Sequence, residues 1–224
     1  MKFEGTRVWG FLNAAIGMRL PMSKDYDDAV SKSDTFQDIP YEVATDRYVG
    51  VKDLALMQKL LKEDKLGGGQ PNSKFMRMIH VQVAITAMQT FWSEFDTYKI
   101  STVSNSTSKM HKLQSYPIDA TCFEQNPIVE ECDVFFATLI KLEGLRKAYL
   151  KSGDKKDWYM LLNNLPLSWL QTRMVDFNYA TIRNMVIWRK NHKLNNWSGL
   201  DNPDMDNFIK WARELPYSKE LLFS

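Results

Sequence analysis

The 224-residue chain is 44% hydrophobic and 25% charged, and its 29 Lys and Arg nearly balance its 27 Asp and Glu. This length suits one globular domain that buries its own core, and the net charge of +2 argues against a strongly basic nucleic-acid-binding protein. Nine residues separate Cys122 from Cys132, which fits neither a zinc site nor a redox pair and indicates reduced thiols inside a cell. No apolar segment resembles a signal peptide or is long enough to span a bilayer, so a cytoplasmic protein is expected.

The first part of the chain predicts a short strand, two helices and a long loop. Residues 3–9 suit the strand and residues 11–18 a helix of one or two turns. Residues 19–50 are polar and contain two prolines, which predicts a long loop that is mobile or forms a lid. The apolar spacing of residues 51–65 predicts an amphipathic helix. Residues 67–71, Gly-Gly-Gly-Gln-Pro, are typical of a flexible turn.

The middle of the chain predicts a strand followed by an aromatic-rich helix. Apolar and polar residues alternate over residues 81–85, which is typical of a strand, and Phe91, Trp92 and Phe95 follow at helical spacing. Residues 130–150 predict the longest helix, which Gly153 ends.

The C-terminal part predicts further helices and one strand. Asp154 is expected to cap a helix that carries Trp158 into the core, and residues 168–177 read as extended. Asn178 is a predicted N-cap for the next helix, and Asn202 for the last one, with Pro203 at its first position. Helices outnumber strands and do not alternate regularly with them, so the predicted class is α+β in a single domain over residues 1–224.

Small polar side chains and cations gather between residues 98 and 112. Hydroxyl and amide groups bind phosphate oxygens, and Lys99, Lys109 and Lys112 supply positive charge. A solvated polar loop would have the same composition, and both interpretations remain open.

A second group of polar residues comprises Gln171, Arg173, Asn178 and Arg189. If residues 178–190 are helical, Asn178 and Arg189 lie on one face with apolar residues between them. An arginine at the end of a buried stripe needs an anionic partner, which is either a ligand or a structural carboxylate. The histidines do not show metal-ligand spacing, so no metal site is predicted; His111 and His192 are candidates for a ligand site, whereas His80 suits a core position.

These two segments resemble the flavin-dependent thymidylate synthases. That family carries the motif R-H-R-x-x-S-x-N-E-x-S-x-R-Y, onto which this chain places Thr97-Tyr98-Lys99, then Thr102, Ser104-Asn105, Thr107 and Lys109-Met110. Downstream, Leu165-Pro166-Leu167-Ser168, Asn178-Tyr179-Ala180 and Trp188-Arg189 follow the family's order, with eleven residues from Asn178 to Arg189.

The resemblance implies a fold, a ligand and a set of site residues. The fold would be helix-rich α+β, with a central, mostly antiparallel sheet flanked by helices, in a homotetramer of bacterial or phage type. The substrate would be a pyrimidine deoxynucleotide such as dUMP, FAD the cofactor and methylene-tetrahydrofolate the one-carbon donor. The residues it assigns to the nucleotide are Thr102, Ser104, Asn105, Ser106, Thr107, Lys109, Gln171, Arg173 and Arg189. Those it assigns to the cofactor are Tyr98, Lys99, Asn178 and His192, and no catalytic residue is assigned.

Three functions remain open from the sequence. One is an FAD-dependent, thymidylate synthase-like methyltransferase. Another is a non-catalytic nucleotide-binding protein on the same fold, which the replacement of R-H-R by Thr97-Tyr98-Lys99 favours because Arg-to-Lys replacement loses a two-pronged phosphate contact. The third is a structural protein whose aromatic residues serve assembly. Tyr98 and Trp188 are the aromatic residues expected to contact a ligand.

Overall fold

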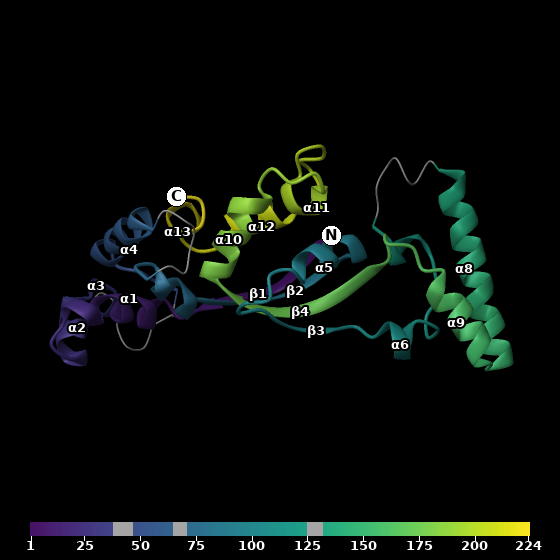
Figure 1. Ribbon diagram of the computed structural model, residues 1–224, viewed down its shortest axis with the longest axis horizontal. Coiled ribbons are helices and arrows are strands. Elements are labelled where there is room, and N and C mark those ends of the chain that lie inside the picture. The colour runs from purple at the N-terminus through teal and green to yellow at the C-terminus, as the bar shows by residue number, and fades with distance from the viewer. Residues whose placement is uncertain (38–46, 65–70, 125–131) are drawn as a thin grey trace.

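A four-stranded antiparallel sheet forms the centre of the computed structural model, which describes residues 1–37, 47–64, 71–124 and 132–224 (Figure 1). The strands are β1 (Lys2–Trp9), β2 (His80–Met88), β3 (Val103–Ser106) and β4 (Leu170–Asn178), in the order β1-β2-β4-β3. Strands β2 and β4 pair along their whole lengths, from His80 opposite Asn178 to Met88 opposite Leu170. The α+β class and the antiparallel sheet are confirmed.

One face of the sheet is covered and carries the core. Alternate residues of β2, from Val81 to Ala87, are fully buried, and those between them are half-buried. Helices α5 (Gln89–Phe95), α10 (Tyr179–Arg189), α11 (Asn195–Ser198) and α12 (Phe208–Arg213) lie on one side of the sheet in Figure 1. Their buried aromatic residues and the buried side chains of β2 and β4 form a single hydrophobic cluster.

Short helices occupy much of the segment predicted as a long loop. They are α2 (Tyr26–Lys32), α3 (Asp34–Gln37) and the 3-10 helix η1 (Leu20–Met22), which follow α1 (Phe11–Arg19). The Asp25 side chain caps α2 by accepting the Asp28 N–H, a local signal that the overall polarity of the segment concealed. The prediction of an unbroken loop is therefore wrong for the described part. Residues 38–46 lie outside the described residues, and a lid function stays a prediction.

The next elements agree with the sequence. Helix α4 (Val51–Glu63) buries Met57 and Leu61, and the 3-10 helix η2 (Lys74–Met78) leads into β2. The glycine-rich turn at 67–69 lies outside the described residues.

Helices α8 (Asp133–Ser152) and α9 (Lys155–Asn163) form a hairpin at one end of the molecule (Figure 1). Gly153 ends α8 with a φ of 64°, and the Asp154 side chain caps α9, as predicted. The hairpin packs on a second, smaller hydrophobic core. Helix α6 (Lys109–Lys112) and the 3-10 helix η3 (Ala120–Cys122) precede the hairpin in the sequence. Trp158 is only half-buried, so its predicted place in the core is wrong. Leu161 is the residue of α9 that enters the smaller core, and the Trp158 ring packs against Tyr159 with centroids 4.9 Å apart.

The predicted cap of the last helices is also wrong. Asn207, not Asn202, caps α12, because the buried side chains Phe208, Ile209 and Trp211 begin directly after it. Helix α13 (Ser218–Leu221) follows and is the last helix in the described part of the chain. Across these described ranges, none of the helices combines the length and apolarity needed to cross a membrane.

Candidate functional site

Arg189 anchors the first half of the candidate site at the C-terminal end of α10. Its Nε donates to the Tyr98 hydroxyl at 2.9 Å, and its Nη1 lies 2.6 Å from a Glu94 carboxylate oxygen. The guanidinium group also lies over the rings of Tyr98 and Trp197, 5.4 and 5.2 Å from their centroids. Only 14% of the Arg189 side chain is exposed, so these contacts hold its orientation.

His192 faces the same carboxylate from the turn that follows α10. Its Nδ1 accepts the Leu194 backbone N–H at 3.1 Å, which places the ring proton on Nε2 in the neutral imidazole. Nε2 lies 3.9 Å from Glu94. Burial and, secondarily, the positive charge of Arg189 lower the pKa of His192, while Glu94 opposes that shift.

Arg173 on β4 anchors the second half. Its Nη1 lies 2.7 Å from the Asp96 carboxylate, its Nε contacts the Gln171 side-chain oxygen at 3.3 Å, and its guanidinium group lies 4.2 Å from the Trp92 ring centroid. Lys109, at the start of α6, donates to the Gln89 side-chain oxygen at 2.7 Å. Burial, and then the charge of Arg173, lowers the pKa of Lys109, so these two cations are electrostatic neighbours.

A layer of aromatic rings joins the two halves. Trp92 packs against Phe95 with centroids 5.4 Å apart, and the Phe95 ring lies nearly parallel to Trp197 at 6.5 Å. Arg173 lies over one end of this layer and Arg189 over the other. The rings themselves are buried, so the arrangement holds two guanidinium groups beside an aromatic cluster, which suits a ligand that carries an anionic group.

The structure only partly gathers the predicted hydroxyl-rich residues. Ser104, Asn105 and Ser106 lie on the exposed edge strand β3, where successive side chains point to opposite faces, so they form no common phosphate cradle. Thr102 donates to the Tyr98 carbonyl at 2.5 Å, and Thr107 pairs with β4, where its carbonyl accepts from Gln171. These contacts fix the path of the chain between the two arginines.

The remaining predicted residues divide between structural and exposed positions. Asn178 is buried and caps α10 by accepting the Thr181 N–H at 3.0 Å, as its position predicted. Lys99 and His111 are exposed. Trp188 is 72% exposed, on the outer side of α10.

Sequence reasoning missed the two carboxylates Glu94 and Asp96. Glu94 lies in the last turn of α5 and Asp96 is its C-cap residue. Negative charge is unfavourable at a helix C-terminus, so two acids at that position signal a need for cationic partners. The sequence contains this signal, but it does not identify which cations pair with the two acids.

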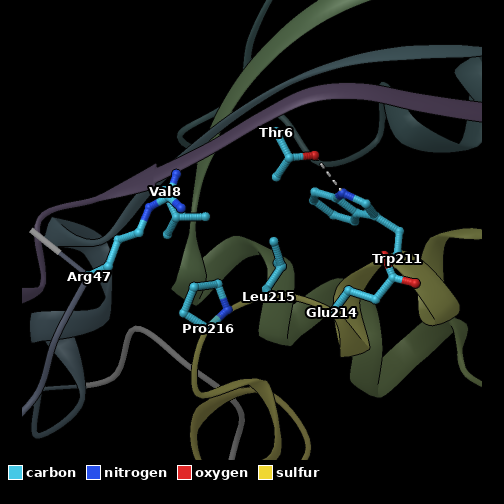
Figure 2. A pocket seen from close by; sticks show the side chains of 7 residues that line it. All are labelled: Thr6, Val8, Arg47, Trp211, Glu214, Leu215 and Pro216. Atoms are coloured by element: carbon cyan, nitrogen blue, oxygen red, sulfur yellow. Dashed lines mark hydrogen bonds between the residues drawn. The ribbon is translucent and has the colours of Figure 1, made fainter. Parts of the chain in front are cut away.

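Other parts of the surface offer weaker sites. A cleft of about 250 Å³ lies beside β1, with Arg47 and Glu214 on opposite sides and the Thr6 hydroxyl accepting the Trp211 indole N–H at 3.1 Å (Figure 2). Its two charged side chains lie at an open surface, which gives no specific recognition. Among the residues that the structure describes, no group of three His, Cys, Asp or Glu side chains could hold a metal ion.

Known structures share this fold over the whole chain. Two crystal structures of the flavin-dependent thymidylate synthase ThyX from Helicobacter pylori, both with FAD and dUMP, match with TM-scores of 0.63 and 0.65. Each match covers 100% of this chain and 98% of the ThyX chain, at 16% and 15% identity. This chain has the fold of ThyX. No family model matches the sequence, and the search of curated proteins gives no significant match.

Three of the four residues that the family resemblance assigns to FAD already have hydrogen-bond partners within the chain. Tyr98 is engaged by Arg189, Asn178 caps a helix, and His192 Nδ1 accepts a backbone N–H. Of these four residues, only Lys99 is an exposed cation that is left to contact the diphosphate of FAD.

Proposed function

We propose that this chain binds a pyrimidine deoxynucleotide, with dUMP as the first candidate, around the C-terminal end of α5. The observation that carries the proposal is the pair of arginines, Arg189 and Arg173, held over one aromatic layer. The shared fold supports the choice of ligand, because the ThyX structures that match it contain dUMP and FAD.

Each residue has a stated role in this proposal. Arg189 binds the phosphate at one end of the layer, and Arg173 and Lys109 contact oxygen atoms of the sugar or base at the other. Tyr98 and Trp197 hold Arg189 in position, and Gln171 and Thr107 fix Arg173 and the strand beside it. Ser104, Asn105 and Ser106, which lie on the exposed β3, are assigned to the nucleotide by the polar composition of their segment and by the family resemblance.

The test is a thermal-shift titration of the full chain with dUMP, deoxyuridine and dAMP. A ligand that binds only the folded state raises the melting temperature, by an amount that grows with its concentration. We expect dUMP to raise it more than deoxyuridine, since deoxyuridine lacks the phosphate, and more than the purine dAMP. An absence of any shift would contradict the proposal and favour a structural role.

A second candidate is flavin-dependent one-carbon transfer to the nucleotide with methylene-tetrahydrofolate as donor. The FAD present in the ThyX structures favours it, whereas the occupied side chains of Tyr98, Asn178 and His192 favour a non-catalytic nucleotide-binding protein. We expect the purified protein to show no flavin absorption band. A stoichiometric flavin band would instead support the enzyme.

We also propose that the chain self-associates, as the family resemblance implies for a tetramer. The face of the sheet opposite the core leaves Met174 of β4 51% exposed and Val103 of β3 68% exposed. Apolar surface of this kind often marks an interface. Light scattering coupled to size-exclusion chromatography would give the oligomeric state, and a monomeric mass would contradict this proposal.

A further inference from the structure

Glu94 stands at an electrostatically unfavourable position. It lies in the last turn of α5, where the partial negative charge of the helix end repels a carboxylate. Its side chain is 41% exposed, so burial only partly restrains it there. Its ion pair with Arg189 is the interaction that keeps the carboxylate over the site.

The carboxylate occupies the position in which a ligand anion would be bound. The Arg189 Nη1 lies 2.6 Å away and the His192 Nε2, which carries the ring proton, lies 3.9 Å away. The Arg189 Nε is already engaged by Tyr98, so Glu94 takes up the side of the guanidinium group that faces His192. The Glu94 carboxylate thus pairs with the Arg189 guanidinium group, which is the group proposed to bind the ligand's anion.

Arg189 has contacts that do not involve Glu94. The Tyr98 hydroxyl accepts from its Nε, and the rings of Tyr98 and Trp197 lie beneath the guanidinium group. Glu94, by contrast, can turn into solvent by a change of its own rotamer. A ligand therefore needs to displace one exposed side chain, and the cationic group that receives it is already oriented.

We propose that Glu94 is a specificity-determining residue that competes with the ligand for Arg189, so that only a strongly anionic ligand such as a phosphate monoester displaces it. This inference rests on the proposed nucleotide-binding function. It predicts that removing the Glu94 charge strengthens binding, whereas a purely structural ion pair would predict weaker or unchanged binding.

The test compares the wild type with Glu94→Gln by calorimetric titration with dUMP and, separately, with inorganic phosphate. Gln keeps the size of Glu and one acceptor oxygen but removes the negative charge. Asp206→Asn is the matched control, because it removes one carboxylate from an exposed pair with Lys210. Because an exposed ion pair of this kind is weak and must be broken before the ligand binds, we expect Glu94→Gln to bind dUMP about two- to fivefold more tightly and Asp206→Asn to match the wild type.

The two ligands separate the failure of this inference from that of the proposed function. Wild-type binding of dUMP with equal or weaker binding by Glu94→Gln would overturn the role of Glu94 and leave nucleotide binding intact. Phosphate binding that appears in Glu94→Gln and is lost in Glu94→Gln/Arg189→Ala, without any dUMP binding, would support the role of Glu94 and contradict the nucleotide. No binding of either ligand by any variant would overturn both.

Discussion

Replacing Arg189 with alanine removes the group on which the proposed site depends. The change eliminates the 2.6 Å ion pair with Glu94, the 2.9 Å hydrogen bond to Tyr98 and the stacking on Trp197. Because Glu94 is 41% exposed, its pair with Arg189 contributes only about 0–1 kcal/mol to folding. The hydrogen bond and the ring contacts together add about 2 kcal/mol, so the protein should lose about 2–3 kcal/mol of stability and remain folded.

The same substitution should also weaken ligand binding. Loss of a charge-assisted contact weakens binding by about 1–3 kcal/mol, which is about 5- to 150-fold in Kd, and the unpaired Glu94 would then repel an anionic ligand. Calorimetric titration with dUMP measures this change. Arg213→Ala is the control, because Arg213 also lies over an aromatic ring, that of Phe223 at 4.5 Å, but lies outside the proposed site. A folded Arg189→Ala protein with wild-type affinity would refute the assignment of Arg189.

Three further predictions concern stability. Asn178→Ala should lower the free energy of unfolding by about 0.5–2 kcal/mol in urea titration, because the cap of α10 is lost; an unchanged midpoint would contradict this role. Asp53→Asn should lower it by about 3–5 kcal/mol, since a buried carboxylate that accepts from Ser33, Thr35 and Arg19 is replaced by an amide; a loss below about 1 kcal/mol would argue against it. Hydrogen bonding from Arg146 lowers the pKa of Glu143 to about 2, so the stability that this pair contributes is present above the ordinary Glu pKa and is lost as the pH falls toward 2. Wild type and Glu143→Gln should therefore differ in melting temperature at neutral pH and converge in acid, and a constant difference would contradict the shift.

Local signals predicted the elements that carry the site. The cap at Asn178 and the spacing to Arg189 follow from helix periodicity and capping, and both hold in the structure. The alternation over residues 81–85 predicted a strand whose burial pattern alternates along β2. These features depend on residues close in sequence.

Long-range partners were not predictable in the same way. The carboxylates of Glu94 and Asp96 meet arginines that are 95 and 77 residues away, and only the packing of α10 and β4 against α5 brings them together. The composition of the hydroxyl-rich segment left open both a phosphate site and a solvated polar loop, and pairing with β4 spreads the side chains of residues 103–106 over two faces of an edge strand. The predicted N-cap at Asn202 is wrong because a second capping residue, Asn207, directly precedes the buried side chains of α12.

A crystal structure of the full chain grown with dUMP tests the central claim most directly. We predict electron density for the nucleotide at the C-terminal end of α5, with its phosphate or base oxygens within hydrogen-bond distance of Arg173 or Arg189. We also predict that the Glu94 carboxylate is turned away from Arg189. Crystals grown at saturating dUMP that show the nucleotide at another place on the protein would contradict the account. Crystals that show no nucleotide and an intact Glu94–Arg189 pair would contradict it as well.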